Sequence, residues 1–217
     1  MKAKRTKRVK AKPHKAKKTD AAGKIRILCV SDYHRDKGMA DNVEKLARKE
    51  KVDVIINAGD FLSEEFAAKV FASTSFITFV VHGNWDRHLK ARSKRVKVLV
   101  NEVAEHKGYY FLGAEYGHYD VIEKLAKGKN PKKLIIITHD PPYDILDLSY
   151  FGSNAGMPEL RDIIEKLKPA MHVFGHIHES AGVVKHKGTL FVNAALPEFR
   201  KAAIVDLPSQ KVAVFDV

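Results

Sequence analysis

Short apolar runs alternate with amphipathic segments in the N-terminal part of the chain. The runs at residues 25–30, 52–57 and 76–81 are rich in β-branched residues, and we expect them to form buried strands. Between the first two runs, residues 39–50 place apolar side chains at helical spacing, and Ser63 is the expected N-cap of a second helix. This order of strands and helices predicts βαβ units with parallel strand pairing.

The remainder of the chain contains more strands than helices. Its expected elements are a short helix at 96–106, a strand at 109–112, a helix at 120–127, a strand at 134–138, an amphipathic helix from 158 to 167, and strands at 171–174, 182–186, 189–192, 202–206 and 212–217. Lys187-Gly188 is expected to form a hairpin turn. So many apolar strands need two packed sheets with helices outside them.

Polar motifs follow five of the predicted strands. They are Asp32-Tyr33-His34, Gly59-Asp60, His82-Gly83-Asn84-Trp85-Asp86, His139-Asp140-Pro141-Pro142 and Gly175-His176-Ile177-His178. Sites in α/β sheets form beyond the carboxyl ends of the strands, so we expect these motifs to converge. In an extended backbone Asp32 and His34 would face the same way, and the glycines would let the chain turn sharply near the site.

The side chains of these motifs have the chemistry of metal ligands. Carboxylates, imidazoles and one carboxamide are the ligand set of a two-metal centre, and Asp60 has two oxygens with which to bridge two ions. Mixed nitrogen and oxygen ligands suit Mn, Fe, Zn, Co or Ni better than Ca or Mg. No thiolate is among them, which makes a structural zinc site a poor match.

The positive charge of the chain is concentrated at one end. The net charge is +13, but residues 1–19 contain ten Lys or Arg and no acid, so residues 20–217 carry only +3. We expect a disordered basic tail at 1–22 and one folded domain at 23–217. Such a tail either contacts nucleic acid or serves as a solvated segment that aids solubility, and both interpretations stay open.

Cysteine content and hydropathy indicate the compartment. The single Cys29 lies in an apolar run and is expected to be a buried, inert thiol. No apolar stretch reaches the ~18 residues of a membrane span, and the basic N-terminus lacks the apolar core of a signal peptide. These features predict a cytoplasmic protein that does not bind membranes.

With its five motifs in this order after strands, the region of about residues 25–200 resembles the calcineurin-like metallophosphoesterases. The resemblance implies an α/β fold, a four-layer αββα sandwich of two mixed sheets with helices outside. It implies one metal bound by Asp32, His34, Asp60 and His178, and a second bound by Asp60, Asn84, His139 and His176. The two ions would share a water, and the resulting hydroxide would attack phosphorus in line with the leaving oxygen.

One position departs from the family pattern. Many members have His where this chain has Trp85, and that His is thought to contact phosphate or to protonate the leaving group. An indole cannot act as a general acid, so we expect a preference for good leaving groups, with Trp85 available to stack on a base or aryl group. Asn84 and Asp86 are the predicted catalytic residues, and without His at position 85, Asp86 would pair with Arg87 or a backbone N–H. Arg35 and His82 are further candidates for substrate contact.

The most direct interpretation is a hydrolase, a binuclear phosphoesterase acting as a phosphodiesterase on a nucleotide or nucleic-acid-like substrate. Three alternatives stay open: a phosphomonoesterase of the same fold, a nucleic-acid-processing nuclease that uses the basic tail, and a protein-binding scaffold with weak catalysis. A scaffold should have lost ligands, whereas all seven are present here. The physiological substrate and the oligomeric state are not determined by the sequence.

Overall fold

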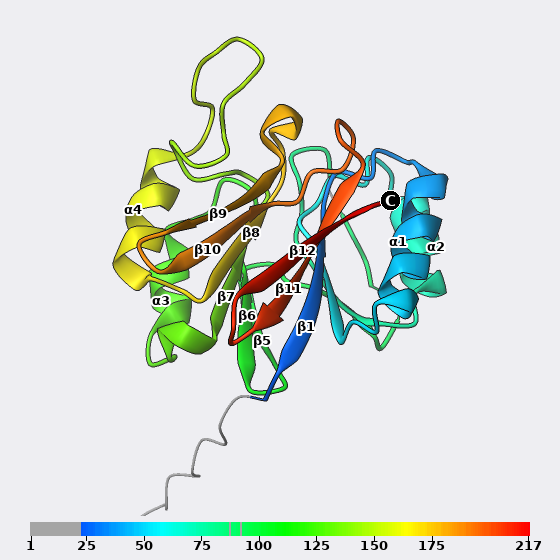
Figure 1. Cartoon of the computed structure of the whole chain (residues 1–217), viewed down its shortest axis with the longest axis horizontal. Helices are drawn as coiled ribbons and strands as arrows, with labels where there is room; N and C mark the ends of the chain where they lie inside the picture. The colour runs from blue at the N-terminus through cyan, green and yellow to red at the C-terminus, as the bar shows by residue number, and fades with distance from the viewer. Residues whose placement is uncertain (1–22, 87, 92) are drawn as a thin grey trace, which may run out of the picture.

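Two six-stranded sheets pack face to face in the computed structural model, which describes residues 23–86, 88–91 and 93–217 (Figure 1). The first sheet has the order β12 (Lys211–Asp216), β11 (Lys201–Leu207), β1 (Ile25–Val30), β2 (Val54–Asn57), β3 (Ile77–Val80) and β4 (Val96–Val98). The second has the order β5 (Glu102–His106), β6 (Tyr109–Gly113), β7 (Leu134–Ile137), β8 (Met171–Phe174), β10 (Thr189–Asn193) and β9 (Gly182–His186). Both sheets mix parallel and antiparallel pairs.

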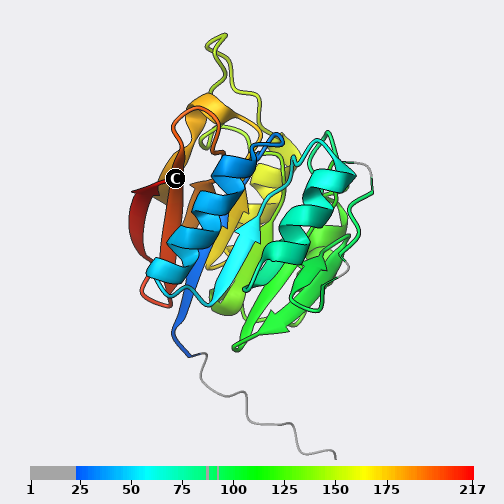
Figure 2. The ribbon, with the colours of Figure 1, turned by 90° about the vertical axis from the view of Figure 1, so that its right-hand side faces the viewer.

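Helices cover the outer faces of both sheets. The longer ones are α1 (Lys37–Lys49), α2 (Glu64–Ser73), α3 (Val121–Ala126) and α4 (Pro158–Leu167), and the 3-10 turns are η1 (Pro131–Lys133) and η2 (His178–Ser180). Helices α1 and α2 lie over the first sheet, and α3 and α4 lie over the second (Figures 1 and 2). This arrangement confirms the predicted αββα sandwich. No helix within the described residues has the length and apolar character of a membrane span.

The main core lies between the two sheets. The rings of Phe79 and Phe111 stack there, with centroids 4.3 Å apart, and join β3 of the first sheet to β6 of the second. Cys29 is fully buried in the same layer, and burial raises the pKa of its thiol, as expected for an inert cysteine. Each fully buried large apolar side chain contributes about 1.5–3 kcal/mol. The two sheets are therefore held together independently of the polar loops at their ends.

Local signals explain the helices on the first sheet. The Asp36 side chain accepts a hydrogen bond from the Met39 N–H at 2.9 Å and caps α1. Ser63 accepts from the Phe66 N–H at 3.3 Å and caps α2, as predicted. The expected tail at residues 1–22 lies outside the described residues, as does Arg87.

One expected element is wrong. Residues 96–106, predicted as a short helix, form strands β4 and β5 on opposite sheets. The alternation Val96-Lys97-Val98 fits an edge strand, which pairs in parallel with β3. Lys107-Gly108, with φ of 48° and 76°, then forms a hairpin turn. It repeats the correctly predicted Lys187-Gly188 turn, where φ is 47° and 91°.

Candidate metal centre

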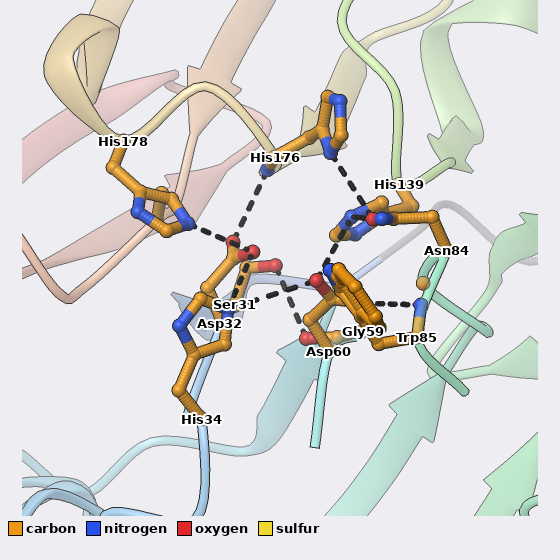
Figure 3. A network of polar contacts seen from close by, with 12 residues as sticks. Ser31, Asp32, His34, Gly59, Asp60, Asn84, Trp85, His139, His176 and His178 are labelled. Atoms are coloured by element: carbon orange, nitrogen blue, oxygen red, sulfur yellow. Dashed lines mark hydrogen bonds and ion pairs between the residues drawn. The ribbon is translucent and has the colours of Figure 1, made fainter. Parts of the chain in front are cut away.

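The five polar motifs lie together at the carboxyl edge, by which we mean the edge where the parallel strands end (Figure 3). The first sheet contributes the residues that follow β1, β2 and β3, and the second contributes those that follow β7 and β8. These residues are Asp32, His34, Asp60, Asn84, His139, His176 and His178. Side chains up to 146 positions apart in sequence therefore reach one site.

The first cluster joins Asp32, His34 and His178. Nε2 of His178 lies 3.4 Å from Oδ1 of Asp32, and Nε2 of His34 lies 3.7 Å from the same oxygen. Three ligand atoms of these residues lie within 4.8 Å of one another, a spacing at which they could hold one ion. Asp32 is fully buried, while both histidines are partly exposed.

The second cluster joins Asp60, Asn84, His139 and His176. The Asn84 amide oxygen lies 2.9 Å from Nε2 of His139 and 3.2 Å from Nδ1 of His176. Nε2 of His139 is also 3.6 Å from Oδ2 of Asp60. Nδ1 of His139 donates to the Ala58 carbonyl at 2.8 Å, so Nε2 keeps its lone pair free for a ligand.

Asp60 lies between the two clusters. Its Oδ2 is 3.6 Å from Nε2 of His34 in one cluster and 3.6 Å from Nε2 of His139 in the other. Its Oδ1 accepts a hydrogen bond from the Trp85 backbone N–H at 3.1 Å. This bond holds the carboxylate in the orientation that directs Oδ2 toward both histidines.

Unsatisfied buried atoms show that this donor set suits a cation. Oδ1 of Asp32 and Nε2 of His34 are buried and have no hydrogen-bond partner in the described part of the chain. Such atoms usually cost about 1–3 kcal/mol each. Two ligand atoms bound at about 2.1 Å to one tetrahedral ion lie about 3.4 Å apart, close to the separations found here. The residues therefore fit a metal.

The Asn84 amide has two possible orientations. In the first, its oxygen faces the His139 and His176 nitrogens, so three acceptors converge as ligands around a cation do. In the second, its nitrogen donates to those same atoms, and its oxygen accepts from the Trp85 indole N–H at 3.0 Å. The exchange needs only a rotation of the amide. Asn84 can therefore act either as a ligand or as a hydrogen-bond donor within this cluster.

Strained backbone positions several of these side chains. Asp32, His34, Asp60 and His176 have φ of 59°, 46°, 61° and 71°, in the left-handed region. The expectation that Asp32 and His34 converge through extended backbone is therefore wrong, because the chain coils sharply after β1. Asp and His tolerate this region better than branched residues do, and each such position costs about 1–3 kcal/mol. The folded sheets must supply that energy.

The glycines of the motifs allow close approach. A Cβ on Gly175 would lie 2.2 Å from Oγ of Ser31 and 2.3 Å from Oδ2 of Asp32, and one on Gly83 would lie 2.0 Å from Oδ1 of Asp60. Of the three motif glycines, only Gly59 also has positive φ, at 104°. The sharp turns predicted at all three glycines therefore occur at Gly59, whereas Gly83 and Gly175 are needed for space.

Charges within the site shift the pKa values of its groups. Burial alone would raise the pKa of Asp32, but the His178 ring at 3.4 Å and the charge of His139 hold it below its ordinary value. The nearby Asp32 carboxylate in turn raises the pKa of His178. Burial and the neighbouring His139 lower the pKa of His176. Asp32 is thus an anion and His176 neutral at pH 7, the forms that bind metal.

Asp86 lies behind the site and does not point into it. Its two oxygens accept from the backbone N–H groups of Asp60 at 2.7 Å, Phe61 at 3.0 Å and Gly83 at 3.1 Å. Of the two pairings proposed from the sequence, the one with a backbone N–H is therefore observed. Asp86, predicted as a catalytic residue, ties the Asp60 loop to the Asn84 loop.

The three expected substrate contacts differ in position. The Arg35 guanidinium donates to the Leu62 carbonyl at 2.7 and 3.1 Å, which leaves only part of its fork free. His82 is buried, with Nδ1 3.8 Å from a Glu115 oxygen. Trp85 is 68% exposed beside Asp60 and Asn84. Of the three, Trp85 is the one with a large free surface next to the clusters.

Asp140, which directly follows His139 in one of the five motifs, also joins the site. It is buried, its Oδ2 accepts from the Tyr119 hydroxyl, and its Oδ1 lies 4.0 Å from Nε2 of His176. Its position directly after His139 was an available signal. Carboxylates that face the second nitrogen of a metal-binding His commonly orient the ring.

Comparison with known proteins identifies relatives of this chain. The family model for calcineurin-like phosphoesterases matches residues 25–180. A Caenorhabditis elegans UPF0046 protein, K07C11.7, is 26% identical over 216 residues, covering 82% of this chain and 71% of that protein. The human metallophosphoesterase domain-containing protein 1 is 34% identical over 84 residues, covering 36% of this chain and 26% of that protein.

Solved structures share the fold. The protein TT1561 of Thermus thermophilus has a TM-score of 0.68 at 15% identity and covers 88% of this chain and 98% of its own. A structure described as a novel archaeal phosphodiesterase has a TM-score of 0.55 at 14% identity and covers 89% of this chain and 100% of its own. At these identities the similarity is one of architecture.

Proposed function

This chain belongs to the calcineurin-like phosphoesterase family of metal-dependent phosphoester hydrolases, and from that premise we propose that it is a phosphodiesterase with two metal ions at the carboxyl edge. One ion would be held by Asp32, His34, Asp60 and His178. The other would be held by Asp60, Asn84, His139 and His176. Residues 23–217 would form this catalytic domain.

The position of Asp60 carries this proposal. A carboxylate oxygen at the same 3.6 Å distance from a histidine of each cluster is suited to bridging. Two single-metal sites would not need a shared ligand between them. The scaffold alternative is disfavoured, because the chain maintains four strained left-handed residues at this site. It also keeps buried ligand atoms there without hydrogen-bond partners among the described residues.

The residues of the chain prepare this chemistry. Two ions, when bound, would acidify a shared water and neutralise charge on the phosphoryl oxygens. Asp86 and the Trp85 N–H hold the Asp60 loop and its carboxylate in place. The Ala58 carbonyl keeps the proton of His139 on Nδ1, away from the site.

Trp85 supports a diester with a good leaving group as the substrate. Its indole lacks a transferable proton, so the leaving oxygen must depart without a general acid at this position. Its exposed ring offers a flat surface for an aryl group or a nucleobase. Among the possible metals, manganese is the first to test, followed by Fe, Zn, Co and Ni.

Two finer proposals rest on the sequence. The basic segment 1–19 would contact nucleic acid, and the buried thiol of Cys29 fits a cytoplasmic setting. Neither is required for the hydrolase activity. Their failure would leave the proposed reaction unchanged.

Metal analysis with a substrate panel tests the reaction. We expect about two ions per chain and faster hydrolysis of aryl phosphodiesters than of aryl monoesters, with loss on chelation and recovery with Mn²⁺. Full activity with one ion per chain would contradict the two-metal proposal. Preference for the monoester would favour the phosphomonoesterase.

Replacing Trp85 tests the leaving-group proposal. Trp85→His should accelerate alkyl diesters relative to aryl diesters by about 10²-fold, the lower end of general acid catalysis. Trp85→Phe is the matched control, because it keeps an aromatic surface without an acid. An unchanged rate ratio in Trp85→His would count against the role assigned to this position.

A further inference from the structure

Basic residues gather at the amino edge, by which we mean the edge of the sheets opposite the metal centre. There the connections are residues 23–24, 50–53, 74–76, 93–95, 107–108, 127–133, 168–170, 187–188 and 208–210. Together these segments contain eleven Lys or Arg and two acids, Glu50 and Asp53. Since residues 20–217 have a net charge of only +3, this excess reflects an uneven distribution over the fold.

Hydrogen bonds join several of these connections into one continuous surface. The Gln210 side chain donates to the Ala170 carbonyl at 2.8 Å and the Gly188 carbonyl at 3.4 Å. The Ala170 N–H donates to the Pro131 carbonyl at 2.8 Å. The segments that carry Lys132, Lys168, Lys187 and Lys211 therefore meet around Ala170.

Several lysines of this surface have no partner for their charge among the described residues. The side chains of Lys127, Lys132, Lys168 and Lys211 are exposed and make no ion pair or hydrogen bond within the described residues. Lys107 and Lys187, by contrast, pair with Asp53 and Glu165.

The described part of the chain also begins at this edge. It starts at Gly23, directly before β1, and Lys24 and Arg26 lie at the start of that strand. In the sequence, residues 1–19 contain ten further Lys or Arg. The surface proposed below rests on the described residues alone.

The chemistry of this end favours nucleic acid over a membrane. A membrane-binding surface combines basic residues with exposed apolar anchors. Within the described residues, the exposed aromatic side chains are Trp85, Tyr116, Tyr143, Tyr150, Phe151 and Phe199, and all lie in carboxyl-edge loops. The amino edge combines an excess of basic residues with no exposed aromatic side chain in its described part, which suits the repeating charges of a phosphate backbone.

We propose that the amino edge is a nucleic-acid binding surface that contacts the phosphate backbone without reading its sequence. Because the metal centre lies at the other edge, nucleic acid bound at the amino edge is not positioned for hydrolysis there. Its binding would hold the protein on the nucleic acid. The proposal does not depend on the reaction at the metal centre. It requires only the charge distribution of the two edges.

Salt-dependent binding tests the surface in the full-length chain. The test variant carries Lys127→Gln, Lys132→Gln, Lys168→Gln and Lys211→Gln. Its control carries Lys37→Gln, Lys45→Gln, Lys69→Gln and Lys90→Gln, which removes the same charge elsewhere. Fluorescence anisotropy with a short RNA duplex, and with a DNA duplex of the same sequence, is followed between about 50 and 200 mM salt.

We expect the test variant to bind at least about tenfold more weakly, with the salt slope reduced by about two to four, because each lost phosphate contact removes about 0.9. The salt slope of the control variant should fall by less than about one. Both variants should hydrolyse a small aryl diester at the wild-type rate. Equal losses in the two variants would overturn the proposal in favour of net charge alone. Wild-type binding to phosphatidylserine vesicles but not to either duplex would also overturn it.

Discussion

The connections at the two edges of the sheets differ in amino-acid composition. The described connections at the carboxyl edge, residues 31–36, 58–63, 81–86, 88–91, 99–101, 114–120, 138–157, 175–181 and 194–200, contain eleven acids, three Lys or Arg and seven of the eleven histidines. Those at the amino edge contain two acids and eleven Lys or Arg. The first edge includes a connection of twenty residues, while the second includes two-residue hairpin turns.

Left-handed backbone occurs at both edges but serves a different purpose at each. At the carboxyl edge, four candidate ligands have left-handed backbone, and three buried atoms lack hydrogen-bond partners among the described residues, namely Oδ1 of Asp32, Nε2 of His34 and Nε2 of His82. At the amino edge, left-handed residues such as Lys107 and Lys187 lie in short turns that close the sheets and supply no candidate ligand. The apolar core lies between the edges and supports the strained residues at both of them. Changes at the two edges should therefore separate activity from stability.

The largest contrast is expected between two aspartates that flank β2. Asp60→Asn removes the charge shared by the two clusters, so metal content and kcat/KM should fall, the latter by about 10³-fold, or about 4 kcal/mol. Asp53→Asn, at the other end of the strand, should leave activity within about twofold and cost about 1 kcal/mol of stability through its bonds to Arg26 and Lys107. Metal analysis, kinetics and denaturant unfolding measure both. Activity retained in Asp60→Asn would remove the basis for a bridging ligand.

A second contrast compares Gly175 with Gly182, which precede and follow the 3-10 turn η2. The Cβ of Gly175→Ala would collide with Ser31 and Asp32, so we expect about a 10²-fold loss of activity and a stability loss of about 1–3 kcal/mol. In Gly182→Ala the nearest atom is Cδ2 of Leu146 at 3.7 Å, an ordinary contact, and little should change. If both variants behaved alike, close packing around Asp32 would not explain the role of Gly175.

A smaller effect is expected behind the second cluster. Asp140→Asn weakens the orientation of His176, so affinity for one metal ion should fall about tenfold, while binding of the other stays unchanged. Titration with Mn²⁺ under equilibrium dialysis separates the two sites. Tyr119→Phe should produce a weaker loss in the same direction, since it removes one bond to Asp140. An equal effect on both ions would indicate a general loss of structure.

The smallest effect concerns an ion pair near the amino edge. Hydrogen bonds from Lys187 and Arg161 hold the pKa of Glu165 at about 2, below its ordinary value of 4.5. The contribution to stability is therefore present above pH 4.5 and is lost as the pH falls toward 2. Glu165→Gln should be less stable than wild type at pH 7, with the difference narrowing below pH 4.5 and activity unchanged. A difference in stability between the two proteins that stayed constant with pH would show that the ion pair does not cause it.

Much of the fold follows from local patterns. The apolar runs and caps predicted β1, β2, β3, α1 and α2, because burial and capping depend on neighbouring residues. The segment 96–106 was missed, since Val96–Val98 is too short for a clear period and becomes a strand only by pairing with β3. The Lys107-Gly108 turn was a usable signal, identical in kind to Lys187-Gly188.

The site was predictable in its composition but not in its geometry. The spacing of Asp32 and His34 suggested extended backbone, whereas the chain adopts left-handed conformations there. The contacts of Asp86 with Asp60, Phe61 and Gly83 join two loops that follow different strands. Contacts of that kind depend on the register of neighbouring strands, which short motifs do not contain.

The sequence by itself determined which side chains could bind metal and that they follow buried strands, because side-chain chemistry and apolar patterning are local properties. Only the tertiary structure decided that Asp60 lies between two histidine clusters and that the lysine-rich turns gather at the opposite edge. Those relations depend on the packing and register of two sheets, which bring residues as distant as 32 and 178 into contact. Distances of this kind are set by the whole core.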